Sequence, residues 1–297
     1  MHIPVLLKEV IENLNPKPNK NYIDATLGEG GHSLEILKHI LPDGRLLGID
    51  FDPRNLDFVR NRFTTEGIPE SNFVLVNDNF KNLKTIVEQQ KFANVSGILF
   101  DLGLNSYFLD ESKRGFSFRF DEPLDMRFDE KTSIKACDVI NNSTKEELEQ
   151  ILRDYGEENF AESIVKNIIE YRSQKEIKTT YELNDIVKQA TPNWYHHRKI
   201  HPSTKTFMAL RIHVNQEFSN LKTALKSATE IVEKNGRIAI ISFHSLEDRI
   251  IKNYFKELEQ QKLFKPINKK TIVPKWTEVK QNKRSRSAKL RVIEKIN

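Results

Sequence analysis

Apolar residues in the first hundred positions alternate between short continuous runs and longer stretches with helical spacing. The continuous runs, typical of buried strands, cover 22–27, 45–50, 73–77 and 95–101. The stretches with apolar residues at helical spacing cover 5–14, 33–41, 53–63 and 83–90. Strands that alternate with amphipathic helices in this way predict an α/β fold with a doubly wound, parallel sheet.

The pattern changes after residue 102. No run of the buried-strand type occurs in 103–199, which instead holds a loop rich in aromatic and charged residues at 114–129. Helical patterns follow over 143–155, 159–171 and 181–190, and residues 143–146 read as a capping box for the first of them. We therefore expect a helical subdomain inserted at 103–199.

The strand and helix pattern of the core resumes near residue 200. It predicts a bent helix over 205–234, a strand over 237–242, a helix over 246–261 and an edge strand over Ala288–Ile293. The expected core thus comprises 1–102 and 200–297.

A glycine-rich turn joins the first predicted strand to its helix. The sequence Gly28-Glu29-Gly30-Gly31-His32-Ser33 nearly satisfies the dinucleotide-binding pattern G-x-G-x-x-G/A. Its glycines allow a tight turn and a close approach of backbone to ligand. Asp50 ends the next strand, where an acidic residue commonly binds a ribose diol. Together these features predict a nucleoside-binding site.

Carboxylates at the same sheet edge favour a cationic nucleoside over a dinucleotide. Asp24 lies inside the first strand, and Asp78 and Asp101 follow the third and fourth. Such anions repel a pyrophosphate but attract a sulfonium, so S-adenosylmethionine (AdoMet) is the expected cofactor. Phe51 and Phe80 are both candidates to cover the adenine ring. Asp78 is equally suited to accepting from the adenine amino group or to forming a turn.

The segment after the fourth strand, Asp101-Leu102-Gly103-Leu104-Asn105-Ser106, is where methyl acceptors meet the cofactor in this architecture. An exocyclic amine is a weak nucleophile, and polar groups that hold its N–H bonds orient its lone pair toward a methyl group. Asp101 and Asn105 are the predicted catalytic residues, although Asp101 could instead bind the cofactor. The loop lacks the Pro-Pro-aromatic tetrapeptide typical of DNA amino methyltransferases, which disfavours a DNA substrate.

Net charge is unevenly distributed along the chain. Residues 262–297 hold twelve Lys and Arg against two acidic residues, so this basic segment carries +10 and the remaining 261 residues carry −5. The asymmetry favours a polyanionic partner, with a solvated lysine-rich tail as the alternative.

The single cysteine, Cys137, excludes an internal disulfide framework and a cysteine-based zinc site. No apolar stretch approaches a membrane span, and the first residues lack the layout of a signal peptide. We expect a cytoplasmic protein without a membrane partner.

Histidines mark two further segments. His196, His197 and His201 lack a spacing suited to metal binding, so no metal site is predicted, and this basic loop is read as facing RNA, with Trp194 and Tyr195 available for stacking. His244 follows the fifth strand of the core and could be a proton acceptor, a phosphate contact or a helix cap.

Many ordered blocks of the chain resemble the bacterial 16S rRNA (cytosine-N4)-methyltransferases, the MraW family. The blocks are HIPVLLKEV, YIDATLGEGGHS, GIDFDP, FDLGLNS, LDESKRGFSF, LDMRFD, YGEE, HPSTKTFMALRIHVNQE, ISFHSLEDRIIK and RSRSAKLRV.

The resemblance implies direct methyl transfer from AdoMet to N4 of a cytidine (position 1402 by convention) in the decoding centre of 16S rRNA. It assigns cofactor contacts to Gly30, Gly31, His32, Asp50, Phe80 and Asp101. The family usually has a glutamine in a sixth cofactor position, where this chain has Phe108.

The implied substrate is 16S rRNA within the assembled small ribosomal subunit, and a homodimer is left open. The residues expected to contact RNA are His201, Lys205, Arg211, His244, Arg284 and Arg286. Two alternatives stay open: a methyltransferase acting on another RNA or protein amine, and an AdoMet-binding ribosome assembly factor without transfer activity.

Overall fold

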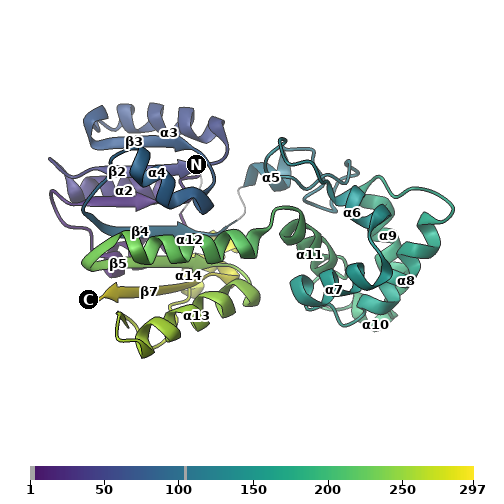
Figure 1. The fold of residues 1–297 in the computed structure, drawn as a ribbon. Helices are drawn as coiled ribbons and strands as arrows, with labels where there is room; N and C mark the ends of the chain where they lie inside the picture. Colours follow the sequence, from purple (N-terminus) through teal and green to yellow (C-terminus); the bar gives the residue numbers. More distant parts are fainter. Residues whose placement is uncertain (1–3, 104–105) are drawn as a thin grey trace. The chain divides into compact units, whose positions relative to one another are not determined.

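The computed structural model describes residues 4–103 and 106–297, which form two compact units. The first unit comprises residues 1–103 and 218–297, and the second comprises 104–217. Figure 1 shows the sheet in the first unit and the helices of the second.

A seven-stranded sheet forms the centre of the first unit, in the order β3-β2-β1-β4-β5-β7-β6. All pairings from β3 to β5 are parallel, and β7 is antiparallel to both β5 and β6. The strands are β1 (Asn21–Asp24), β2 (Leu46–Asp50), β3 (Phe73–Asn77), β4 (Val95–Asp101), β5 (Val232–Ser242), β6 (Phe264–Pro266) and β7 (Lys289–Lys295). The chain winds outward from β1 to β3 and then returns to β4, so the order reverses between β1 and β4. This reversal confirms the doubly wound α/β prediction and marks the place where such sheets bind ligands.

Helices cover both faces of the sheet. One hydrophobic core joins the sheet to α1 (Leu7–Leu14), α2 (Gly31–Ile40) and α3 (Pro53–Thr65). The other joins it to α4 (Leu83–Gln89), α12 (Glu217–Ile231) and α13 (Ser245–Gln260). The short elements of this unit are η1 (Glu70–Asn72), η2 (Phe80–Asn82), α14 (Trp276–Gln281) and η3 (Lys283–Ser287). Apolar residues on both faces of each central strand explain why the strands read as continuous hydrophobic runs.

The second unit is helical. Its helices are α5 (Ser106–Asp110), α6 (Ala136–Asn142), α7 (Lys145–Gly156), α8 (Ala161–Arg172), α9 (Thr180–Ala190), α10 (Asn193–His196) and α11 (Thr204–Val214). Because α11 packs on α7 and α6, this unit continues to residue 217, whereas the sequence placed its end at 199.

Three local expectations differ from the structure. The bent helix expected over 205–234 is two helices, separated where Gln216 adopts a φ of 51°. The capping box of α7 lies one residue later than expected, with Thr144 and Glu147 exchanging the two bonds. The strand expected at the sheet edge, β7, is instead covered by β6, a three-residue strand that shortens the exposed edge.

Within the described part of the chain, the helices are too short or too polar to span a bilayer.

Substitution of Gly30 tests how closely the glycine turn after β1 packs against α3. It has a φ of 71°, and a Cβ at this position would lie 2.9 Å from both methyl carbons of Val59. We expect Gly30→Ala to lower the free energy of unfolding by about 2–4 kcal/mol, because backbone strain and overpacking add. Urea denaturation measures this loss.

Gly67 is the matched control, since its φ is 75° and a Cβ added there would have no other atom within 4 Å. Gly67→Ala should cost only the strain of the left-handed backbone, about 1 kcal/mol. Equal losses in the two variants would show that Val59 does not restrict the turn.

Candidate cofactor and active site

The turn after β1 is fixed by contacts within the chain. Backbone bonds continue the sheet beyond β1, with Ala25 N donating to Leu99 O and Leu27 N to Ile49 O, each at 2.9 Å. A Cβ on Gly31 would lie 2.3 Å from Cγ of Pro4. Close packing against the chain itself therefore requires a glycine at this position, in addition to any approach by a ligand.

Asp24 anchors β1 to α2. Its carboxylate accepts from Ser33 Oγ at 2.7 Å and from the backbone N–H of Thr26 at 3.1 Å, and the residue is only 1% exposed. Burial raises the pKa of Asp24 above its ordinary value. The sequence interpretation treated Asp24 as an anion inside the first strand that attracts a sulfonium. The structure instead shows a buried carboxylate engaged in structural hydrogen bonds.

Asp50, at the carboxyl end of β2, lies at the centre of a hydrogen-bond network. Its Oδ2 accepts from Gly28 N at 2.8 Å and from Asn55 Nδ2 at 3.1 Å, and its Oδ1 accepts from Asp52 N at 2.8 Å. An ionised carboxylate has about four acceptor sites, so the three bonds leave capacity for a ribose hydroxyl. Burial raises the pKa of Asp50 to about 6.

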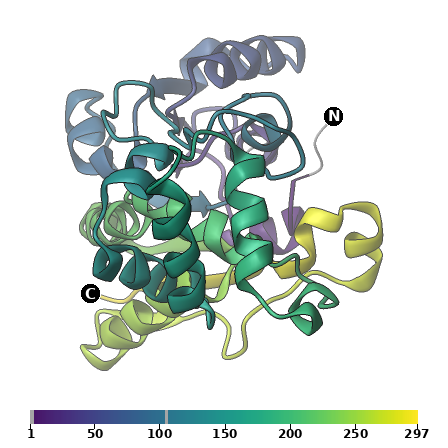
Figure 2. The same cartoon turned by 90° about the vertical axis from the view of Figure 1, so that its right-hand side faces the viewer.

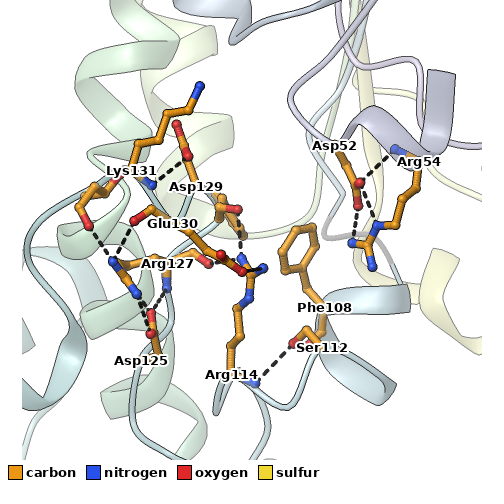
Figure 3. Close-up of polar contacts among 12 residues, drawn as sticks. Asp52, Arg54, Phe108, Ser112, Arg114, Asp125, Arg127, Asp129, Glu130 and Lys131 are labelled. Atoms are coloured by element: carbon orange, nitrogen blue, oxygen red, sulfur yellow. Dashed lines mark hydrogen bonds and ion pairs between the residues drawn. The ribbon is translucent and has the colours of Figure 1, made fainter.

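Two supporting residues of this network were not anticipated from the sequence. Asp52 caps α3 through the backbone N–H of Arg54, whose guanidinium forms two further bonds to the same carboxylate (Figure 3). An acidic residue directly before Pro53 is a recognisable helix start and could have identified Asp52. Asn55 carries no such signal, because its contact with Asp50 depends on how α3 packs.

The end of β3 turns back across the edge of the sheet. Asp78 N donates to Asp50 O at 3.0 Å, and Asp78 Oδ1 accepts from Asn79 N at 2.6 Å and from Asn82 Nδ2 at 2.8 Å. The structure thus shows the turn-forming role for Asp78. The half-buried Phe80 packs edge-on to Phe100, with ring centroids 6.1 Å apart.

A buried histidine and a half-buried carboxylate meet where the strand order reverses between β1 and β4. His32, on α2, places Nε2 3.6 Å from Oδ2 of Asp101, at the end of β4. The backbone N–H of Asp101 donates to Thr26 Oγ1 at 2.6 Å, which fixes this end of β4 beside β1. Among the described residues, both ring nitrogens of His32 and Oδ1 of Asp101 are buried without a hydrogen-bond partner. Buried polar atoms are rarely left without a partner, so this pair is a candidate position for a ligand.

Asn105, the second predicted catalytic residue, lies outside the described residues. Phe108 is described and is 2% exposed. Its ring packs edge-on to Phe116 and Phe128, at centroid distances of 5.1 and 5.2 Å. At this position, where the resemblance led us to expect a glutamine, the chain has an aromatic core residue of the second unit.

The loop that carries Phe128 is held by two arginines (Figure 3). The Arg114 guanidinium donates to the carbonyls of Arg127 and Phe128 at 3.2 and 3.1 Å. Arg127 makes two bonds to the Asp125 carboxylate and donates to two further carbonyls of the same loop. Asp125 in turn has its pKa lowered, since the bonds from Arg127 outweigh the opposing effect of burial. The aromatic, charged loop identified in the sequence is thus an ordered scaffold.

The predicted RNA contacts on α11 and before it have structural partners in the second unit. His201 stacks on Phe118 with a centroid distance of 4.4 Å, and burial lowers its pKa. Lys205 Nζ donates to Glu157 O at 2.6 Å, and Arg211 makes two bonds to the Glu217 carboxylate. Their contact with RNA stays a prediction.

The other predicted RNA contacts lie in the first unit. His244 is the N-cap of α13 in a reciprocal box with Glu247, which is the helix-cap alternative of the sequence interpretation. Arg284 and Arg286 are exposed on η3.

Tyr195 contradicts the expectation that it is available for stacking. It is 4% exposed, and its hydroxyl donates to the buried carboxylate of Glu158 at 3.0 Å. Burial raises the pKa of Tyr195 to about 12. Trp194 is 58% exposed, and Arg198 lies 5.3 Å above its ring.

The fold and the site together define the class of the protein. A doubly wound sheet with a glycine turn after β1, a carboxylate at the end of β2 and polar groups where the strand order reverses is the arrangement of a nucleotide-binding α/β fold.

Comparison with known proteins identifies the family. The chain belongs to the MraW methylase family, whose family model matches residues 1–296, and it is an AdoMet-dependent methyltransferase. A Clostridioides difficile protein is 43% identical over 310 residues, and a Clostridium botulinum protein is 44% identical over the same length, each alignment covering 99% of both chains. A Mesoplasma florum protein is 45% identical over 311 residues, again with 99% of both chains covered. All three relatives are named ribosomal RNA small subunit methyltransferase H.

The raised pKa of Asp50 predicts opposite pH effects on folding and on cofactor binding. In the folded protein the proton is held up to about pH 6, so the stabilisation from this group is present at acidic pH and is lost as the pH rises through about 6. Lowering the pH from 7.5 to 5 should therefore raise the Asp50 contribution by about 1 kcal/mol. The predicted role of Asp50 is to bind the ribose hydroxyls through its ionised carboxylate. With that role, the same change should weaken AdoMet binding by about tenfold.

Urea denaturation and calorimetry at both pH values measure these shifts. Asp50→Asn is the control, since it keeps the side-chain shape without the titration. If the wild-type protein and this variant show the same pH dependence, the shift does not arise from Asp50.

Proposed function

We propose that this protein transfers a methyl group from AdoMet to the exocyclic N4 of cytidine 1402 in 16S rRNA, within the small ribosomal subunit. The observation that carries the proposal is the pair of His32 and Asp101 at the sheet position where the methyl acceptor is expected. Both ring nitrogens of His32 and Oδ1 of Asp101 are buried without a hydrogen-bond partner among the described residues. The names of the curated relatives support ribosomal RNA of the small subunit as the substrate class.

The residues present fit AdoMet. Asp50 would hold the ribose, and Phe80 would border the adenine from the end of β3. The turn around Gly30 and Gly31, with His32, would face the amino acid end of the cofactor. When bound, AdoMet supplies an electrophilic methyl group. His32 and Asp101 have buried polar atoms without partners among the described residues, and this observation supports placing the reacting groups beside them.

Asp101 would act on the amine of the substrate. An N4 lone pair is delocalised into the cytosine ring, so the amine must be held in an orientation that frees the lone pair. A carboxylate oxygen that accepts an N–H bond would do this, and Oδ1 of Asp101 is a buried acceptor without a partner among the described residues. Fixation of the Asp101 backbone by Thr26 would limit the movement of this acceptor. The amine proton can then pass to Asp101 or to water.

The first experiment is methyl transfer from labelled AdoMet to small ribosomal subunits that lack the modification. We expect N4-methylcytidine at one decoding-centre position, identified by mass spectrometry of the nucleosides. Methyl transfer to an amine of another RNA or of a protein would show that the proposed substrate is wrong. AdoMet and subunit binding without transfer would instead favour an assembly factor.

Asp101→Ala tests the proposed acceptor role. Loss of the carboxylate should lower turnover by about 100-fold or more, with a much smaller effect on RNA affinity. Single-turnover rates and RNA binding measure the two effects, and calorimetry of AdoMet tests the cofactor-binding alternative for Asp101. Equal losses in turnover and RNA binding would indicate a scaffolding role.

A further inference from the structure

A basic loop with an exposed tryptophan projects from the sheet between β6 and β7. It consists of residues 273–287, which include α14 and η3, and we refer to it as the C-terminal loop. The chain leaves and rejoins the sheet at one point, where Ile272 and Leu290 exchange backbone hydrogen bonds of 3.1 and 2.9 Å. Both ends of the loop are therefore tied to a buried strand.

Internal contacts hold the C-terminal loop against the body of the unit. Glu278, its sole acidic residue, accepts from the backbone N–H of Leu6 at 2.8 Å. Ser285 is fully buried, and its Oγ donates to Asn282 O at 2.8 Å. Figure 2 shows this part of the chain, in yellow, beside the purple N-terminal segment. The loop thus presents its outer side chains from a fixed backbone.

The outer side chains of the loop are of the types that commonly bind nucleic acid, cationic and aromatic. Trp276 is 77% exposed, the highest value among the large apolar side chains that the structure describes. The exposed cations Lys275, Lys280, Lys283 and Arg286 share the loop with it. For these four cations, the described residues provide no carboxylate within 4.0 Å.

Trp276 differs in this respect from the other tryptophan of the chain. Trp194 packs edge-on to Phe160 at 5.8 Å and lies below the Arg198 guanidinium, so its ring is already in contact with neighbours. Trp276 leaves most of its ring to solvent on a positively charged loop that is anchored by the contacts above. Cations that track phosphates around an aromatic ring that stacks on a base are the elements of single-stranded nucleic-acid recognition.

We propose that the C-terminal loop binds a single-stranded segment of the RNA substrate, with Trp276 stacked on an unpaired base and the surrounding cations on its phosphates. This proposal rests on the RNA substrate of the proposed function and adds a contact outside the methyl-transfer site. The positive charge of the loop would suit an acidic protein surface as well as RNA. Stacking of Trp276 on a base distinguishes RNA from such a surface, so the experiments test the stacking.

The test measures binding of the full-length protein to a short unstructured RNA by fluorescence anisotropy. Trp276→Ala should weaken binding by about tenfold or more, and Trp276→Phe should retain most of the affinity because a phenyl ring also stacks. Val273→Ala is the matched control, since it removes another exposed apolar side chain of the loop, 57% exposed, without an aromatic ring. It should bind as the wild type does.

A second readout reports the stacking directly. The chain has two tryptophans, so Trp194→Phe leaves Trp276 as the single indole. Its emission should be quenched when the single-stranded RNA binds and should change little with the same sequence in a duplex. Lys280→Ser should lower the slope of log affinity against log salt by about 1 without changing the quenching.

Failure of this proposal is distinguishable from failure of the proposed function. Normal RNA affinity in Trp276→Ala and unquenched emission would overturn the stacking, even if the protein methylates subunits. A change of sedimentation with unaltered RNA binding in Trp276→Ala would instead identify a contact between two copies of the chain and would also overturn it. Absence of methyl transfer by the wild type, with quenching intact, would overturn the proposed reaction and leave the loop as an RNA contact.

Discussion

Everything at the candidate site depends on three carboxylates being held at one edge of a parallel sheet. Asp24, Asp50 and Asp101 end β1, β2 and β4, and the two on β1 and β2 are at least nine-tenths buried. Burying a carboxylate is costly unless hydrogen bonds satisfy it. The three carboxylates differ in how many hydrogen bonds the protein supplies to them, and this difference suggests a different role for each.

Asp24 is satisfied within the protein and serves the fold. Asp50 is satisfied in part, by Gly28, Asp52 and Asn55, and retains capacity for one more donor. Asp101 has a buried oxygen for which the described residues offer no donor. This contrast supports assigning cofactor binding to Asp50 and substrate contact to Asp101.

The same distinction applies to basic groups in the second unit and in the C-terminal loop. Arg127 and Arg211 are bound to carboxylates of their own unit, so much of their charge stabilises local structure. Four cations of the C-terminal loop, Lys275, Lys280, Lys283 and Arg286, have no carboxylate partner among the described residues and remain available for a polyanion. The net charge of the sequence could not distinguish paired cations from unpaired ones, because a count of basic residues does not show which of them contact a carboxylate.

Sequence patterns were enough to predict the sheet and the glycine turn, because both depend on local features: continuous apolar runs and φ-permissive glycines. They also predicted that Asp50 and Asp101 end their strands, as they do on β2 and β4. The cofactor and catalytic roles assigned to these two residues, and the role that the resemblance gave His32, stay predictions. Tertiary packing settled that Asp24 is engaged by Ser33, that Asn55 supports Asp50, and that Tyr195 is buried.

Packing also settled that α11 belongs to the second unit and that β7 is covered by β6. One physical cause underlies all of these cases. Whether a polar or aromatic side chain is exposed depends on partners distant in sequence, and the spacing of residues along the chain does not specify those partners.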